Sequence, residues 1–255
     1  MKMLDGAGDT PMRERPDMMP PELDTLTTTG LLALIDYTLL KPEETLERYT
    51  AFVEEAGRWG FRSVFVPSAH VPLAVGMLEA CDVLVGAPVG FPFGYASTEA
   101  KVAETLSALE DGASELDVVM NISMARSGCW DIVEEDLAAV VEVAREWGKL
   151  SMQHVVVKVI LETPYLDEEQ KVEACRRAVA AGMDYVKTAT GLGPGGATVE
   201  DVSLMRATVG PEVGVKAAGG IRTWEDARAM FEAGANRIGT STGPAIVEGF
   251  IRASG

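Results

Sequence analysis

The stretch VVVKVILETPYLDEEQKVEACRRAVAAGMDYVKT, residues 155–188, carries the pattern that decides the fold. It begins with an apolar run at Val155–Ile160 and ends with another at Tyr185–Thr188. Val-rich runs of this length are typical of parallel strands that helices cover on both faces. Between the two runs, Glu168–Ala181 is predicted to be a helix that stops at Gly182, because glycine commonly ends helices. The stretch therefore predicts one strand–helix–strand unit.

The same unit recurs along the chain. Eight strands are predicted, at Leu34–Tyr37, Ser63–Val66, Val83–Pro88, Leu116–Met120, Val155–Ile160, Tyr185–Thr188, Val213–Ala217 and Arg237–Gly239. Helices are predicted at Pro42–Trp59, Thr98–Asp111, Ile132–Trp147, Glu168–Ala181, Thr198–Val209 and Thr223–Ala233, each followed directly by a glycine. Repeated units with short connections predict a parallel sheet, and eight of them favour a closed (β/α)8 barrel, the TIM barrel.

A doubly wound open sheet is the structural alternative. Such a sheet normally carries a glycine-rich phosphate loop after its first strand. The corresponding stretch here, Ile35–Leu40, contains no glycine. The barrel is therefore the favoured fold, in an α/β chain with a short N-terminal extension.

The length and composition fit one large domain. The chain has 255 residues, of which 47% are hydrophobic, and barrels of this size are usually single domains. We expect residues 29–255 to form the barrel and residues 1–28 to form an extension. The first part of this extension is expected to be poorly ordered and to lead into a short helix near Pro21–Thr27.

The charge of the chain excludes several classes of partner. Lys and Arg total 22 against 39 Asp and Glu, which gives a formal net charge of −17. A field of this sign argues against nucleic acids and anionic membrane surfaces as partners. No apolar run reaches the ~18–20 residues that span a bilayer, and the N-terminus lacks the apolar stretch of a signal peptide.

Cysteine and histidine are too few to predict a metal site. Cys81, Cys129 and Cys175 lie far apart, without ligand spacing and without a disulfide framework. His70 and His154 are the only histidines, and each is more easily explained as a structural group. We therefore expect a reducing, cytoplasmic location, no metal and no cofactor.

Three lysines interrupt predicted strands. Lys158, Lys187 and Lys216 follow one another at intervals of 29 residues, about one strand–helix unit, so we expect them on neighbouring strands at similar height. Burial and like charge both lower the pKa of a lysine. A lysine so shifted has a free amine that can attack a carbonyl group. One such lysine is best explained by a structural ion pair, whereas three together favour catalysis.

Carboxylates are predicted in the same layer. Asp117 lies inside the strand pattern Glu-Leu-Asp-Val-Val-Met, Asp36 lies in Leu-Ile-Asp-Tyr-Thr, and Glu162 closes the Lys158 strand. An interior Asp beside lysines is a candidate for proton transfer. A simple counter-ion role is the alternative, and for Asp36 it is the stronger one.

Three glycine-rich loops follow the last predicted strands. They are Gly191–Gly196, Ala218–Gly220 and Gly239–Gly243, and the first two precede predicted helices. Glycine lets backbone N–H groups approach a phosphate, and helix N-termini favour negative charge. Phosphate commonly binds at these loops in barrels of this class. The sequence therefore predicts a phosphorylated small-molecule substrate.

Long motifs resemble the deoxyribose-phosphate aldolase family, from about Gly30 to Arg252. They are Ile-Asp-Tyr-Thr-Leu-Leu-Lys-Pro (35–42), Gly-Phe-Pro (90–92), Glu-Leu-Asp-Val-Val-Met-Asn (115–121), Val-Lys-Val-Ile-Leu-Glu-Thr (157–163), Tyr-Val-Lys-Thr-Ala-Thr-Gly (185–191), Gly-Gly-Ala-Thr-Val-Glu-Asp-Val (195–202), Val-Lys-Ala-Ala-Gly-Gly-Ile-Arg-Thr (215–223) and Arg-Ile-Gly-Thr-Ser (237–241). This resemblance implies a class I aldolase that joins or releases acetaldehyde and D-glyceraldehyde 3-phosphate, with 2-deoxy-D-ribose 5-phosphate as the sugar. It also implies a homodimer or higher homo-oligomer.

The resemblance implies a role for each matching residue. Lys187 is expected to form the Schiff base, Lys216 to favour its neutral form and relay protons, and Asp117 to transfer protons with Lys216 and a water. The expected substrate-binding residues line the pocket (Lys158, Asp36, Thr38, Thr188) or hold the phosphate (Gly191, Gly219, Gly220, Gly239, Ser241, Thr242).

Departures from the family concern the pocket. The family often has His at Tyr37, Asn-Pro at Pro67-Ser68, Cys at Phe65, and Ser at Ala189 and Thr242. Together with Phe93 and Tyr95, these departures leave the acceptor aldehyde open. The alternatives are a Schiff-base aldolase with another donor or acceptor, and a non-catalytic barrel that binds a sugar phosphate.

Overall fold

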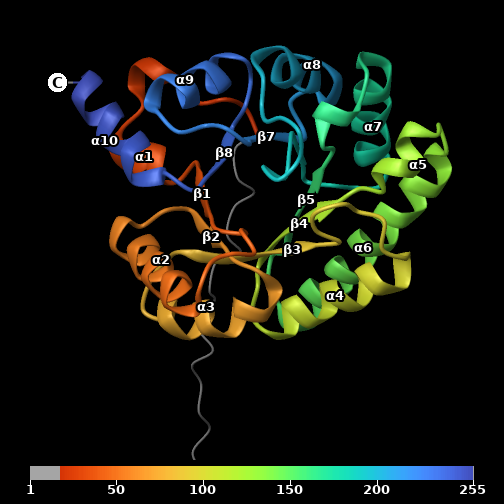
Figure 1. Ribbon diagram of the computed structural model, residues 1–255, viewed down its shortest axis with the longest axis horizontal. Coiled ribbons are helices and arrows are strands. Elements are labelled where there is room, and N and C mark those ends of the chain that lie inside the picture. The colour runs from red at the N-terminus through yellow and green to blue at the C-terminus, as the bar shows by residue number, and fades with distance from the viewer. Residues whose placement is uncertain (1–17, 255) are drawn as a thin grey trace, which may run out of the picture.

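The computed structural model describes residues 18–254, whose strands close into a parallel barrel (Figure 1). Its strands are β1 Ile35–Thr38, β2 Ser63–Phe65, β3 Leu84–Val89, β4 Glu115–Val119, β5 Val156–Ile160, β6 Tyr185–Lys187, β7 Gly214–Ala218 and β8 Arg237–Thr240. Each strand pairs with the next in chain order, and β1 pairs with β8. The predicted TIM barrel is therefore confirmed, and the doubly wound sheet is excluded.

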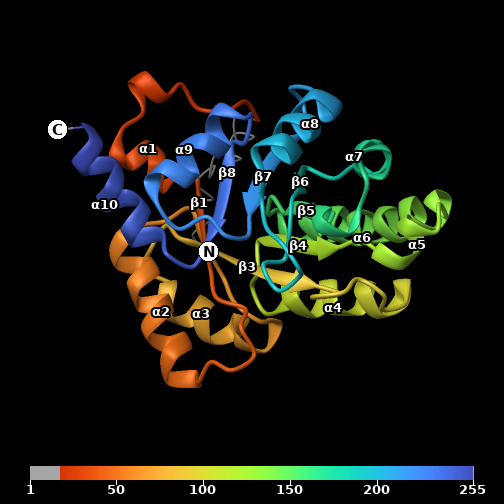
Figure 2. The same cartoon turned by 45° about the horizontal axis from the view of Figure 1, so that its top comes forward.

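Helices surround the barrel (Figures 1 and 2). They are α1 Thr28–Leu32, α2 Leu46–Trp59, α3 Val71–Leu78, α4 Thr98–Glu110, α5 Ile122–Arg126, α6 Trp130–Ser151, α7 Glu168–Ala180, α8 Val199–Val209, α9 Trp224–Glu232 and α10 Gly243–Ser254, with short 3-10 turns η1 Leu23–Thr25, η2 Ser68–His70 and η3 Thr163–Tyr165. The prediction that a helix begins at Pro42 is wrong. It begins at Leu46, because the Thr45 hydroxyl accepts a hydrogen bond from Arg48 N and caps that end.

Five of the six predicted glycine stops are confirmed. Gly60, Gly112, Gly182, Gly210 and Gly234 all have positive φ directly beyond their helices. The stop at Gly148 is wrong, because α6 continues to Ser151 and ends at a left-handed Met152. A Cβ on Gly148 would lie 2.8 Å from the carbonyl oxygen of Gln153, so this glycine instead makes room for the returning chain.

The N-terminal extension is only partly described. The poor order expected for the first part concerns residues 1–17, which lie outside the described residues. The short helix expected near Pro21–Thr27 is the 3-10 turn η1, and α1 follows it. Arg206 Nη2 donates a 2.8 Å hydrogen bond to Met18 O, which ties the start of the described chain to α8.

Side chains along β1 point alternately into the barrel interior and outward to the helices. The Asp36 side chain lies inside the barrel, where it contacts Lys216 and Arg237. The next residue, Tyr37, lies outside, and its ring stacks on Phe52 of α2 at 3.8 Å. The expectation that Tyr37 alters the substrate pocket is therefore wrong, because neighbouring residues of a strand face opposite sides.

A buried ion pair joins α4 and α6, which lie side by side outside the barrel (Figures 1 and 2). Lys101 Nζ donates to Asp136 Oδ2 and, at 2.9 Å, to the carbonyl oxygen of Val119. Thr98 Oγ1 donates to the other Asp136 oxygen at 2.9 Å. Both charged side chains are buried, so each depends on its partner.

We expect Asp136→Ala to lower the free energy of unfolding by about 3–5 kcal/mol, because it leaves the Lys101 ammonium buried without a counter-charge. Urea denaturation measures this loss. The double variant Lys101→Met/Asp136→Leu removes both charges and should lose less than the single variant. Equal or greater destabilisation in the double variant would contradict this explanation.

Candidate active site

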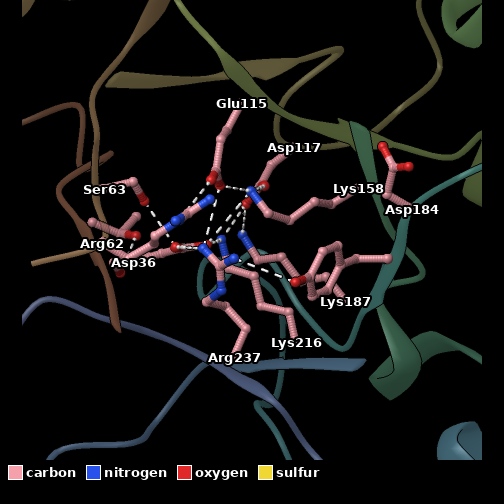
Figure 3. A network of polar contacts seen from close by, with 12 residues as sticks. Asp36, Arg62, Ser63, Glu115, Asp117, Lys158, Asp184, Lys187, Lys216 and Arg237 are labelled. Carbon is pink, nitrogen blue, oxygen red and sulfur yellow. Dashed lines mark hydrogen bonds and ion pairs between the residues drawn. The ribbon is translucent and has the colours of Figure 1, made fainter. Parts of the chain in front are cut away.

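Three lysines converge on one carboxylate inside the barrel, and Figure 3 shows their side chains pointing toward Asp117 of β4. Lys187 Nζ of β6 and Lys216 Nζ of β7 donate to the same oxygen, Asp117 Oδ2, at 2.7 and 2.8 Å. Lys158 Nζ of β5 donates to Oδ1 at 3.1 Å. The lysine cluster, as we call Lys158, Lys187, Lys216 and Asp117, places two amines within reach of one proton acceptor.

The prediction that the lysines lie on neighbouring strands is confirmed, but Lys158 lies two register positions lower than the similar height that was expected. Lys187 and Lys216 are direct partners in the β6–β7 register. Lys158 is the partner of Tyr185, two residues before Lys187. Strands of a barrel are staggered, so spacing along the chain does not fix their register.

A second set of charges lies beneath the lysine cluster. Lys158 Nζ donates to Glu115 Oε2 at 2.6 Å, and Arg237 Nη1 donates to Asp36 Oδ1 at 2.8 Å. The contact between Arg237 and Glu115 is 3.5 Å. Glu115 and Arg237 were missed by the sequence reasoning, although each is a charged residue that begins an apolar strand.

Asp36 and Phe65 complete the surroundings of the amines. The distance between Lys216 Nζ and Asp36 Oδ2 is 2.6 Å, so the predicted proximity of Asp36 is found. The ammonium groups of Lys158 and Lys216 lie 4.4 and 4.2 Å from the centroid of the Phe65 ring. An aromatic face attracts a cation, so the residue at this departure from the family contacts the lysines directly.

Among the fully buried side chains that ion pairs join around Asp117, the charges do not balance. Four cations, Lys158, Lys187, Lys216 and Arg237, accompany three carboxylates, Asp36, Glu115 and Asp117. An excess positive charge is costly in a dry interior, and loss of one proton from an amine removes it. Arginine does not lose its proton in proteins, so the free base must come from a lysine.

The pKa of Lys216 is shifted in the direction that this excess positive charge favours. Burial, together with the charges of Lys187 and Lys158, lowers it to about 8, against the opposing effect of Asp117 and Asp36. The expectation of a lowered pKa is wrong for Lys158: burial alone would lower it, but the carboxylates of Asp117, Glu115 and Asp36 raise it above the usual range.

The pKa of Asp117 moves the opposite way from that of an isolated buried acid. Burial alone would raise it, but the ammonium groups of Lys158, Lys187 and Lys216 outweigh burial and hold the pKa well below the usual range. Asp117 is therefore an anion that accepts hydrogen bonds from both Lys187 and Lys216. This arrangement lets a proton move between the two amines over short distances.

The glycine loops meet at the same end of the barrel. Gly191, Gly219 and Gly220 all have positive φ, which glycine adopts without strain. Ala197 N donates to Gly219 O at 2.9 Å, and a Cβ on Gly196 would lie 2.3 Å from that oxygen. The loop after β6 therefore lies directly against the loop after β7, as a shared phosphate site requires.

Three other predicted binding residues make contacts within the fold. The Thr188 hydroxyl donates to Ala218 O and accepts from Ala218 N, so it joins β6 to β7. Thr38 Oγ1 donates to the carbonyl oxygen of Asp36 and does not join the lysine cluster. A Cβ on Gly239 would lie 3.0 Å from Lys216 Cε, so this glycine makes room for that lysine.

The loop after β8 joins the loop after β7. Thr242 Oγ1 donates to the carbonyl oxygen of Arg222 at 3.3 Å, and Thr242 N donates to Thr240 Oγ1 at 3.0 Å. Ser241 is exposed at the start of α10. Both residues therefore lie where a helix N-terminus could face an anion.

The remaining departures lie around β2, β3 and β6. Ser68 Oγ donates to the carbonyl oxygen of Pro88 at 3.2 Å, directly after Pro67. Ala189 is fully buried beside Gly219. Phe93 and Tyr95 are exposed, and their rings stack 5.4 Å apart in the loop after β3.

Residues 18–254 contain no group of three or more His, Cys, Asp or Glu arranged to hold a metal ion. Cys81, Cys129 and Cys175 are free, and burial raises the pKa of the Cys175 thiol to about 12. None of the helices there is both long enough and apolar enough to span a membrane.

Comparisons with known proteins agree with one another. Residues 43–249 match the model of the DeoC/LacD family of aldolases. The chain is 53% identical over 219 residues to the deoxyribose-phosphate aldolase of Caldanaerobacter subterraneus subsp. tengcongensis, covering 86% of this chain and 93% of the relative. It is 55% identical over 217 residues to that of Thermococcus gammatolerans, covering 84% and 94%.

A solved structure gives the same result. The deoxyribose phosphate aldolase of Aeropyrum pernix, described as tetrameric, superposes with a TM-score of 0.82 at 35% identity. The match covers 91% of this chain and 95% of that one. The likeness therefore extends over nearly the whole barrel.

Proposed function

Because the chain belongs to the DeoC/LacD family of aldolases, we propose that it is a class I aldolase that cleaves and forms 2-deoxy-D-ribose 5-phosphate. The products of cleavage are acetaldehyde and D-glyceraldehyde 3-phosphate. The observation that carries this proposal is the pair of amines, Lys187 and Lys216, on one oxygen of Asp117. Such a pair supplies a nucleophile and a proton acceptor together.

The first half of the reaction forms the Schiff base. The free amine of Lys187 attacks the aldehyde carbon of the substrate and forms a carbinolamine. Loss of water then gives an iminium ion, and the proton needed by the departing hydroxyl is carried by Lys216. Asp117 remains an anion and stabilises the positive charge of the iminium nitrogen, because its Oδ2 already lies 2.7 Å from Lys187 Nζ.

The second half of the reaction cleaves the carbon–carbon bond. A base removes the proton of the hydroxyl next to that bond, and the bonding electrons move into the iminium. Lys216, with Asp117 and a water, takes this proton in the proposed scheme. Glyceraldehyde 3-phosphate leaves, the remaining enamine is protonated on carbon, and hydrolysis releases acetaldehyde and restores Lys187.

The phosphate is proposed to bind where the loops after β6, β7 and β8 meet. The backbone at Gly191 and Gly220 is open to close approach, because neither residue has a side chain and no atom lies within 3.5 Å of where a Cβ would stand, whereas Gly219 packs against Gly196. Ser241 and Thr242 precede α10, whose N-terminus favours an anion. Phosphate binding away from the reacting bond supplies energy for positioning the aldehyde at Lys187.

Location and assembly are part of the same proposal. The free cysteines suit a reducing cytoplasm. The tetrameric structure of a relative supports a homo-oligomer for this chain. The small-molecule partner is the phosphorylated sugar or aldehyde.

The proposal is tested by incubating the purified protein with 2-deoxyribose 5-phosphate and measuring acetaldehyde with a coupled alcohol dehydrogenase. We expect cleavage, and the reverse condensation when both aldehydes are supplied. A panel of other donor and acceptor aldehydes should react more slowly. Saturable binding of the sugar phosphate without any cleavage would instead support a non-catalytic barrel.

A further inference from the structure

Glu162 is buried beneath the loop after β6 but takes no part in the lysine cluster. The residue is 1% exposed and directly precedes η3. Its Oε2 accepts a 2.9 Å hydrogen bond from Thr190 N. Its Oε1 is also buried, and within the described part of the chain it has no hydrogen-bond partner. A carboxyl group with one free buried oxygen calls for an explanation.

The backbone of Glu162 is held in an unfavourable conformation. Its φ of 52° and ψ of 57° place it in the left-handed region, which residues with a Cβ avoid. Hydrogen bonds of both flanking residues hold it there: Leu161 N donates to Lys187 O at 2.9 Å, and Thr163 N donates to Thr188 O at 3.0 Å. Strain of this kind is retained where the surrounding structure enforces it, commonly at functional sites.

The loop after β6 packs closely on this carboxyl group. A Cβ on Gly193 would lie 2.7 Å from Glu162 Oε1, and a Cβ on Gly195 would lie 3.1 Å from Pro164 Cγ. On its other side, Gly196 touches the carbonyl oxygen of Gly219 in the loop after β7. The position of the loop after β6 is therefore fixed by contacts with Glu162 and Pro164 on one side and with Gly219 on the other.

The surroundings of Glu162 also shift the pKa of its carboxyl group. Burial raises the pKa of its carboxyl group, while the Thr190 hydrogen bonds and the charge of Lys187 lower it, and burial prevails. The carboxyl group is thus held closer to its neutral form than a surface glutamate.

We propose that Glu162 is a positioning residue, which holds residues 190–193 through Thr190 N and the Gly193 backbone so that the loop can receive the substrate phosphate beside Lys187. This role rests on the proposed function, because the phosphate belongs to that substrate. Glu162 touches no reacting atom in this scheme. Its effect should therefore fall on phosphate binding rather than on the chemical steps.

The test compares 2-deoxyribose 5-phosphate with 2-deoxyribose, which lacks the phosphate. For Glu162→Ala we expect KM for the phosphorylated sugar to rise about tenfold, the equivalent of one lost hydrogen bond. The kcat for that sugar, and kcat/KM for 2-deoxyribose, should change less than about threefold. Glu162→Gln keeps an oxygen for Thr190 N, so it should restore KM to within about threefold of the wild-type value.

A matched control exists in the loop after β3. Glu104 Oε2 accepts a 2.8 Å hydrogen bond from Gly90 N, in the same way that Glu162 accepts from Thr190 N. Glu104→Ala should leave the ratio of kcat/KM for the two sugars unchanged, because its loop is not among those proposed to hold phosphate. A change in that ratio equal to that of Glu162→Ala would overturn the proposal.

The remaining outcomes are also decisive. If Glu162→Ala does not fold, Gly193→Ala replaces it: its new Cβ would push the loop off Glu162, and KM for the phosphorylated sugar should rise selectively. An unchanged KM in the folded variant, or an equal loss on both sugars, would overturn this role alone. Absence of cleavage by the wild-type enzyme would overturn the proposed function and this role with it.

Discussion

Lys187→Leu abolishes turnover, with an expected loss in kcat on the order of 10⁴-fold or more, because no other group can supply the nitrogen of the Schiff base. Lys216 lies on the same Asp117 oxygen, but its amine is also held by Asp36 at 2.6 Å. It is therefore anchored away from the position that Lys187 occupies at the end of β6. The assay is cleavage of 2-deoxyribose 5-phosphate at saturating substrate.

The same variant should remain folded. The buried cluster holds four cations and three carboxylates, so removal of one cation brings it closer to balance. We expect a melting temperature equal to or above that of the wild type, because the cost of an excess buried charge is removed. Lys149 is exposed on α6, and Lys149→Leu is the matched control that should retain full activity. Wild-type turnover by Lys187→Leu would contradict the account.

Lys216→Leu lowers kcat strongly but leaves the nucleophile in place. We expect a loss of about 10²–10⁴-fold, the range typical of a missing general acid–base group. The difference from Lys187→Leu can be tested by trapping: Lys216→Leu should still form a reducible imine with acetaldehyde, although slowly. A variant with normal kcat would show that Lys216 takes no part in proton transfer.

The role of Lys216 in proton transfer can also be tested by the pH dependence of the reaction. The pKa of Lys216 is lowered to about 8, so its free amine forms as the pH rises through that value. In the wild-type enzyme, kcat/KM, which reports the free enzyme, should rise with pH through an inflection near 8, because the proton acceptor is the unprotonated amine. The inflection should disappear in Lys216→Leu. Its persistence there would assign the titration to another group.

The sequence predicts most of the fold because its signals are local. Apolar runs mark the strands, and glycines with positive φ, such as Gly60 and Gly234, mark the ends of helices. Gly148 also follows a predicted helix, but it does not end one. A side chain there would collide with the backbone at Gln153, so only glycine fits. The helices α1, α3, α5 and α10 were not predicted. Of these, α5 spans only Ile122–Arg126, too short for a clear period.

The site was predictable where a charged residue interrupts an apolar strand. Lys187, Lys216 and Asp117 each stand alone among apolar residues, and the structure brings them together. The raised pKa of Lys158 was not predictable, because it depends on how many carboxylates surround that lysine and therefore on strand register. The free oxygen of Glu162 depends on loop packing and leaves no signal in the sequence.

Reductive trapping tests the central claim most directly. The wild-type protein is incubated with acetaldehyde and borohydride, digested, and sequenced by tandem mass spectrometry. The account predicts loss of activity together with a single N-ethyl group on the side chain of Lys187. A fully active protein whose Lys187 stays unmodified under these conditions, or an ethyl group found only on Lys216 or Lys158, would contradict it.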